Sequence, residues 1–447
     1  MRATSTCGGP RPTTGSGSEV TVRTEPVATA TERPRAELLV LLRALTATAS
    51  PRGREGRLAT ELLDLARVRY PWLRWSGDQA GSDGASVVAE PVSGATAPHV
   101  LVYSHLDTSL TGDERVDEPS TGRADPVPPP AFDTAGRTFA AQGLGVAKAA
   151  AAAAVVGYLE ATRELDRRGV DHRVELLLAG SGTHASPFVV GDDDLAATGL
   201  ARYLVARGRP EAAVVVKSGP PGVLHDEPGS AFLRVELRVP GGPVLFREQA
   251  TPPGGLLAHL GHLLEAIEAW RREHLAARVD GVGQMGVEVG AGHLSAGQAV
   301  KPDLLPALAS VQLYLTTLPD DDVAVVADEL QATVTRHLAG TPLDVATVTV
   351  DHRVVHRAGR SDPTGPWARR VERAWSTGFG REVPRLVGWP GSTDGAHLRH
   401  LGVPTVRLGP AVTADARDPR RERVELDELL RTSHVVARAL VDHVTRG

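Results

Sequence analysis

The chain has 447 residues, of which 41% are hydrophobic and 23% charged, with a formal net charge of -5 at pH 7. This composition is that of a globular protein with a sizeable core, and at ~150 residues per domain the length allows two or more domains. The charge gives no reason to expect nucleic acid or a membrane surface as a partner, and the single cysteine excludes both a disulfide framework and a cysteine-ligated zinc site.

The first segment, residues 1–34, is rich in Thr, Gly, Ser and Pro without periodicity, which favours a disordered tail. It lacks the apolar core of a signal peptide, and no run in the chain approaches the ~18 apolar residues of a membrane-spanning helix. We therefore expect a cytoplasmic location. Two amphipathic helical patterns follow, at residues 36–47 and 54–70.

An alternation of strands and helices comes next. Three short apolar runs are typical of strands covered on both faces, at residues 99–105, 173–180 and 212–216. Helical patterns at 146–169 and 195–208 separate them. This rhythm predicts an α/β fold with a mostly parallel sheet covered by helices, and residues 110–139 are expected to form a long Pro-rich loop.

The pattern changes near Gly229. Strand and helix patterns then follow in the order β-α-β-β-α-β, which is the order of a ferredoxin-like α+β domain. We assign residues 229–345 to this inserted domain. The α/β rhythm resumes afterwards, so residues 35–228 and 346–447 are expected to form one α/β domain around the insertion.

Three motifs accompany this organisation: "SHLD" at 104–107, "PEAAVVVKSG" at 210–219 and "STDGAHLRHLGVPTVRLGP" at 392–410. Together they resemble the di-zinc peptidases and deacylases that include aminoacylase, carboxypeptidase G, acetylornithine deacetylase and succinyl-diaminopimelate desuccinylase. The resemblance runs from about residue 36 to the C-terminus. It implies a metal-dependent hydrolase of amide C–N bonds, with an inserted domain that serves as a lid or for dimerisation.

In that family the first motif supplies a zinc ligand, which matches His105, and a carboxylate that orients it, which matches Asp107. The two-residue spacing places both side chains on one side of the strand. In "GLGVAKAA", Val146 stands where the family has the aspartate that bridges the two metals. Valine has no lone pair to offer, so the repulsion between two dications would be unscreened.

The acidic pair of the family matches "DDDLAATG" if about ten inserted residues are allowed. Asp193 is then the general base and Asp194 a metal ligand, each one methylene shorter than glutamate. Counted directly from the preceding strand, Ser181 and Gly182 take these positions instead. The acidic N-terminus of a helix also explains the run of aspartates, because the helix dipole favours it.

Three further matches concern charge. Lys217 stands at a metal-binding carboxylate position, where an ammonium would repel a dication. It is predicted either to form an ion pair with Asp107 or Asp194, since a buried charge needs a counter-ion, or to act as a desolvated catalytic lysine. Asp418 replaces the last zinc-binding histidine, and aspartate can bind zinc. Asp394 matches a position beside the active site and is a candidate substrate-binding residue.

The inserted domain of the family supplies a histidine, an asparagine and an arginine that contact the substrate. The matching positions here are near Leu245, at Ala299 and near Thr316, so these groups are missing. The favoured hypothesis is a divergent relative that has lost dinuclear-zinc hydrolysis and needs no cofactor. It would bind a small peptide-like or acyl-amino-acid ligand or carry repurposed acyl chemistry, and the resemblance implies a homodimer.

The alternative hypothesis is an active amide hydrolase with a single rebuilt zinc site. It would use His105, Asp194 and Asp418 as ligands and Asp193 as the base, with His184 as a further candidate.

Overall fold

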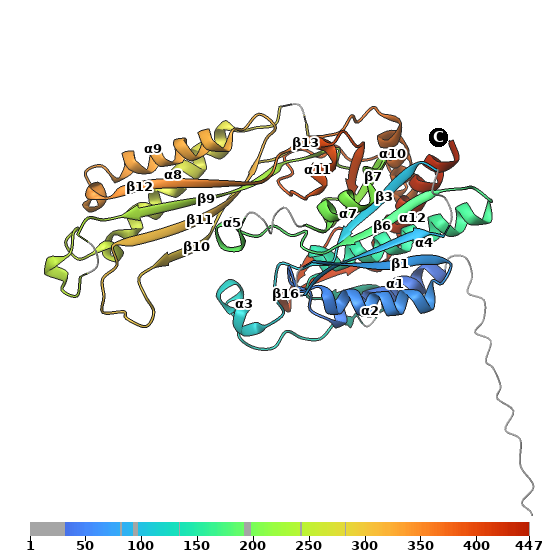
Figure 1. Cartoon of the computed structure of the whole chain (residues 1–447), viewed down its shortest axis with the longest axis horizontal. Coiled ribbons are helices and arrows are strands. Elements are labelled where there is room, and N and C mark those ends of the chain that lie inside the picture. The colour runs from blue at the N-terminus through green and yellow to red at the C-terminus, as the bar shows by residue number, and fades with distance from the viewer. Residues whose placement is uncertain are drawn as a thin grey trace, which may run out of the picture.

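The computed structural model describes residues 32–80, 83–92, 97–133, 135–191, 198–241, 244–281 and 283–446. Two units lie side by side along the long axis of the molecule, an α/β unit and a smaller inserted unit (Figure 1). The α/β fold with a mostly parallel sheet and an inserted α+β unit, expected from the sequence, is confirmed.

The main sheet has six strands in the order β1-β2-β6-β3-β7-β14. Its strands are β1 (Leu73–Ala80), β2 (Gly84–Pro91), β3 (His99–His105), β6 (Arg173–Ala179), β7 (Ala212–Val216) and β14 (Thr405–Leu408). The last four are parallel, whereas β1 and β2 form an antiparallel edge. Every residue of β3 is buried, which explains its uninterrupted apolar sequence.

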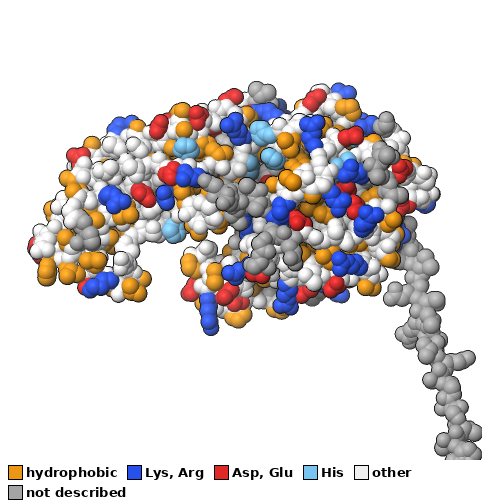
Figure 2. Space-filling model, viewed as in Figure 1, with side chains coloured by type: hydrophobic (Ala, Val, Ile, Leu, Met, Phe, Trp, Pro, Cys, Tyr) orange, Lys and Arg blue, Asp and Glu red, His pale blue; other side chains and the backbone are white. Residues whose placement is uncertain are grey.

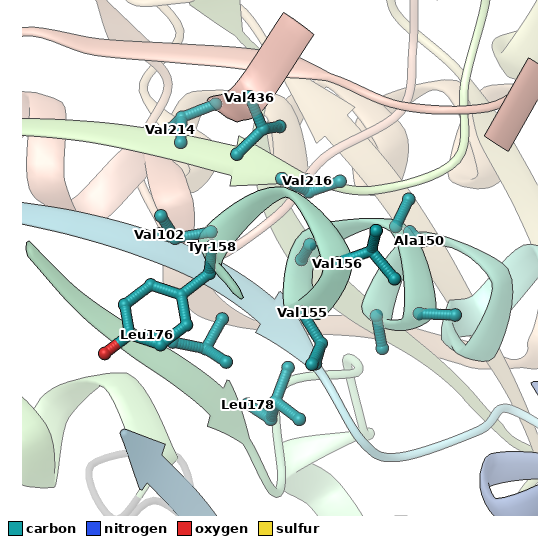
Figure 3. Close-up of a cluster of buried hydrophobic side chains, with 14 of the residues drawn as sticks. Val102, Ala150, Val155, Val156, Tyr158, Leu176, Leu178, Val214, Val216 and Val436 are labelled. Atoms are coloured by element: carbon teal, nitrogen blue, oxygen red, sulfur yellow. The ribbon is translucent and has the colours of Figure 1, made fainter. Parts of the chain in front are cut away.

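Helices cover both faces of this sheet. One face carries α1 (Glu32–Ala47), α2 (Gly56–Arg69), α4 (Ala149–Arg167), α10 (Pro366–Phe379) and α12 (Leu426–Arg446), and the other carries α7 (Gly199–Arg207) and α11 (Gly395–His400). In Figure 3, Val155 and Tyr158 of α4 lie against Leu176 and Leu178 of β6. Among the described residues, 144–167 form one helical stretch apolar enough to cross a membrane, and its burial in this core accounts for that composition.

The inserted unit is an antiparallel sheet in the order β10-β11-β9-β12, with two helices on one face (Figure 1). Its elements are β9 (Gly229–Arg238), α8 (Leu260–Ala277), β10 (Val289–Ala296), β11 (Leu308–Thr317), α9 (Val323–Leu338) and β12 (Thr347–His356). Burial alternates along β9, because only one face packs against the helices. Since β12 pairs with β9 up to His356, the inserted sheet continues past the expected boundary at residue 345.

Two local features differ from the sequence expectations. Helix α3 (Glu114–Thr121) forms within the stretch expected to be a loop, and Asp113 caps it by accepting a hydrogen bond from the Arg115 amide. Residues 32–34, assigned to the tail, belong to α1, while residues 1–31 lie outside the described part of the chain. The smaller elements are β4 (Ala131–Phe132), β5 (Thr138–Ala141), α5 (Pro187–Val190), β8 (Asp226–Glu227), β13 (Gly359–Arg360), β15 (Thr413–Asp415) and β16 (Asp418–Glu425).

Candidate functional site

The candidate site lies at the carboxyl ends of three parallel strands. His105 ends β3, the segment 180–184 follows β6, and Lys217 follows β7. Open α/β sheets bind their ligands at this edge. A cavity of about 510 Å³ opens here, lined by Arg52, Ser181, Gly182, Thr183, His184, Thr198, Leu200, Ala201, Val354, Val355, His356, Asp394 and His397. Several histidines gather on the surface where the two units join (Figure 2).

His105 is bound to a carboxylate through the nitrogen that faces the site. Its Nε2 lies 3.0 Å from Oδ1 of Asp394, which also accepts a hydrogen bond from the Tyr103 hydroxyl. Burial favours the neutral acid, but His105, Tyr103 and the charge of Lys217 outweigh it and lower the pKa of Asp394 to about 2. An ionised carboxylate can only accept, so in this arrangement Nε2 of His105 donates the hydrogen bond. While it makes this contact, Nε2 offers no lone pair to a metal ion.

The segment after β6 closes over His105 and binds Asp107. Gly182 packs so tightly that a Cβ there would lie 2.8 Å from Nε2 of His105. The buried Asp107 carboxylate accepts hydrogen bonds from the amides of Gly182, at 3.0 Å, and Thr183, at 2.6 Å, and from the Thr183 hydroxyl. The predicted contact in which Asp107 orients His105 is not made, because Nδ1 of His105 has no partner among the described residues.

Lys217 is half-buried beside these groups, and it forms no ion pair with Asp107 within the described part of the chain. The Asp107 oxygens are bound to the 182–183 amides instead. Burial and the nearby Arg407 lower the pKa of Lys217 to about 8, although the charges of Asp394 and Asp107 act in the opposite direction. A positive charge therefore occupies the position where the resemblance implies a metal-binding carboxylate.

Asp418 is held by an arginine of its own strand. Nη2 of Arg420 lies 2.6 Å from Oδ2 of Asp418, and Nε lies 3.0 Å from Oδ1. This two-point contact lowers the pKa of Asp418 to about 2. Because both oxygens are bound to a cation, the geometry gives no support to the metal role predicted for Asp418.

Those candidate residues that the structure describes do not assemble into a dinuclear zinc site. Within the described ranges, no group of three or more His, Cys, Asp or Glu side chains is placed to hold a metal ion. Asp193 and Asp194 lie outside these ranges, so their assignments as base and ligand stay predictions. Val146, which lies just before α4, adds an apolar side chain at the bridging position. The described residues therefore do not fit the zinc pair that the resemblance implies.

A pair of histidines in the cavity was largely missed by sequence analysis. Nε2 of His184 lies 3.0 Å from Nε2 of His356, and Nδ1 of His184 lies 3.1 Å from the Tyr314 hydroxyl. Burial, His356 and Lys217 hold the pKa of His184 well below its usual range, and burial also lowers the pKa of His356. The pair joins the α/β unit to β11 and β12 of the inserted unit. Because these segments are distant in the sequence, no local motif indicates the contact.

A buried group of three charges lies next to the candidate site. Glu227 is fully buried and binds Arg399, Arg407 at 3.0 Å and the Thr393 hydroxyl at 2.8 Å. Burial opposes ionisation of Glu227, but the two arginines outweigh it and lower its pKa. The sequence signal was weak, because the three charged residues lie on separate elements. Their contacts join β8, α11 and β14 beside the candidate site.

An α/β unit whose chain is interrupted by an inserted α+β unit, with a cavity at its strand ends, defines a two-unit class of α/β proteins. Residues 101–442 match the peptidase family M20/M25/M40, and the chain belongs to this family. No curated protein matches the chain significantly.

Several solved structures share this fold. Human carnosine dipeptidase 1 is 12% identical over 93% of this chain and 97% of its own, with a TM-score of 0.62. An M20 metallo-carboxypeptidase from Sulfolobus solfataricus is 14% identical over 92% and 99%, with a TM-score of 0.61. A dinuclear metal-binding peptidase from Bacillus subtilis is 13% identical over 93% and 99%, with a TM-score of 0.57. At these identities the likeness shows the fold alone.

Proposed function

We propose that this protein is a cytoplasmic member of the family that has lost dinuclear-zinc hydrolysis and binds a small peptide-like or acyl-amino-acid ligand without a metal. The observation that carries the proposal is the 3.0 Å contact between Nε2 of His105 and Oδ1 of Asp394, with Lys217 close enough for its charge to act on Asp394. Hydrolysis by two zinc ions needs lone pairs and negative charge at these positions. The chain supplies a donor and a positive charge instead.

The cavity supports a ligand that has both a polar and an apolar part. Its volume of about 510 Å³ lies within the range of small-molecule sites. Arg52, Thr183 and His397 offer polar groups on one part of the lining, and Leu200 and Val354 offer apolar surface. A carboxylate and an amide on the ligand would pair with the polar groups, while an acyl or aliphatic group would cover the apolar ones.

The alternative, a hydrolase with one rebuilt metal site, is favoured by a single observation. Nε2 of His184 and Nε2 of His356 converge to 3.0 Å inside the cavity. Two imidazoles that share a first-row metal place their nitrogens at a comparable separation, since each Zn–N bond is about 2.0 Å. A direct hydrogen bond between the two rings explains the same distance without a metal.

Metal content distinguishes the two proposals. Protein purified without chelator is assayed for zinc by mass spectrometry, and hydrolysis is followed on N-acyl amino acids and dipeptides. The metal-free proposal expects well under one zinc per chain, no turnover, and a melting temperature that rises with some of these compounds. His356→Ala should abolish that rise, whereas His337→Ala, on the exposed side of α9, should retain it. About two zinc ions per chain with turnover would overturn the proposal, and one zinc lost in His356→Ala would establish the alternative.

A further inference from the structure

A second cavity, of about 770 Å³, lies apart from the candidate site and shares none of its lining residues. It is formed by one face of α10, the C-terminal half of α12 and the segment 383–385. Arginines dominate its lining: Arg369, Arg373, Arg385, Arg438 and Arg446. The motifs that indicate the family do not include any of these positions.

The positive charge of this cavity is only partly neutralised within the protein. Five arginines and two carboxylates leave a formal charge of +3 on a lining that belongs to a chain of net charge -5. Of the two carboxylates, Glu372 lies 2.8 Å from His225. The other, Asp442, is 4.0 Å from both Arg438 and Arg446, so one carboxylate is shared between two guanidinium groups.

Three of the arginines have no carboxylate within 4.0 Å among the described residues: Arg369, Arg373 and Arg385. Arg369 and Arg373 are four residues apart, so they lie on the same face of α10 and repel each other. Some helix arginines elsewhere in the described chain are paired with a carboxylate, as Arg57 is with Glu61 at 2.9 Å and Arg167 with Glu164 at 2.8 Å. An arrangement of like charges around one hollow is relieved by an anion placed between them.

We propose that this cavity binds the phosphate chain of a di- or triphosphate compound. Planar guanidinium groups contact phosphate oxygens through two parallel hydrogen bonds, and several of them face this hollow from three segments of the chain. The volume exceeds that of a single phosphate and accommodates a chain of two or three. The lining residues include no Phe, Tyr or Trp on which a nucleobase would stack, so the arginines are expected to recognise the phosphates and not the base.

Isothermal titration calorimetry with the whole chain tests this proposal. Inorganic tripolyphosphate, ATP, orthophosphate and adenosine are titrated in turn, because the first two carry the same phosphate chain from different sources. The test variant is Arg369→Glu/Arg373→Glu. The matched control is Arg57→Glu/Arg67→Glu, which makes the same change of charge on the exposed face of α2. Circular dichroism of each variant verifies that it is folded. If the charge reversal in Arg369→Glu/Arg373→Glu unfolds the chain, the neutral variant Arg369→Gln/Arg373→Gln replaces it as the test variant.

We expect tripolyphosphate and ATP to bind with similar affinity, orthophosphate more weakly, and adenosine not at all. The test variant should weaken binding by roughly tenfold or more, and the control by less than about twofold, because two guanidinium contacts are lost only in the first. Equal weakening by both variants would show non-specific attraction to a positive surface and overturn the proposal. Binding of ATP alone, or no binding of either triphosphate at millimolar concentration, would overturn it as well.

Discussion

Replacing Lys217 by methionine tests whether the site holds a positive charge without a direct partner. Its pKa of about 8, against an ordinary value of 10.5, means that the charged form is disfavoured in the folded protein, mainly by burial. At ~1.4 kcal/mol per pKa unit, the charge costs ~3 kcal/mol at neutral pH. Methionine fills a similar volume without this cost, so we expect the free energy of unfolding to rise by ~1–3 kcal/mol.

The effect of Lys217→Met should depend on pH in a definite way. Below pH 8 the lysine is charged in both the folded and the unfolded chain, and the gain of the variant is complete. Between pH 8 and 10.5 the unfolded chain keeps its proton while the folded chain releases it. The stability of the wild type therefore rises with pH in this window, and the advantage of the variant disappears by its upper limit.

Urea unfolding followed by circular dichroism, repeated from pH 7 to 10.5, measures both effects. The control is Lys301→Met, because Lys301 is exposed and forms a surface ion pair with Asp303 at 2.6 Å. Its substitution should change the free energy of unfolding by less than ~0.5 kcal/mol. A loss of ~3–5 kcal/mol in Lys217→Met would refute the reasoning, because that is the cost of breaking a buried ion pair. It would point to a carboxylate partner in the segment outside the described residues.

Three further predictions concern packing, protonation and assembly. Burial keeps His184 and His356 neutral in the folded protein, so below pH 6.5 the unfolded chain takes up protons that the folded chain does not, and the free energy of unfolding should fall as pH drops. Urea titrations at several pH values should show this fall in the wild type. In His356→Asn the slope of the free energy of unfolding against pH should be smaller by up to ~1.4 kcal/mol per pH unit. Gly182→Ala should lower the free energy of unfolding by ~1–3 kcal/mol, since its Cβ would lie 2.8 Å from the His105 ring, and an unchanged melting curve would contradict that close packing. The exposed edge strand β10 could pair with the same strand of a second copy, in which case light scattering should give about twice the monomer mass of 47.1 kDa. The variant His293→Pro in that strand should then be a monomer. A monomeric wild type would exclude this dimer.

The sequence predicted the parts of the fold whose pattern is local. Buried parallel strands such as β3 and β7 carry continuous apolar runs, and the alternating burial of β9 is visible as an alternation of residue types. Two features were missed for physical reasons. The edge strands β1 and β2 contain charged and glycine residues that interrupt any simple pattern. Helix α3 contains Pro119 and is followed by a Pro-rich segment, and this local composition conceals its cap at Asp113.

The site was predicted less completely, because its contacts join distant segments. The motif around His105 located the strand ends, and Lys217 indicated a change of charge. No local pattern indicated that Asp394 would bind His105 across 289 positions, or that Gly182 would cover the ring. The pair of Asp418 and Arg420 is different, because two residues spaced by two on one strand face the same side. That spacing was an available signal for an ion pair.

The closure of the 181–183 segment over His105 bears on how this chain could change during evolution. Introducing aspartate at position 146 alone would add an acidic group to the segment just before α4 without removing the charge of Lys217. Exchanging Lys217 alone for glutamate would place that acid near Asp394 and Asp107, whose charges already act on this position. Either change made singly is therefore expected to lower stability. Under the proposed function, the packing around His105 means that a zinc site could be built here only by several substitutions made together.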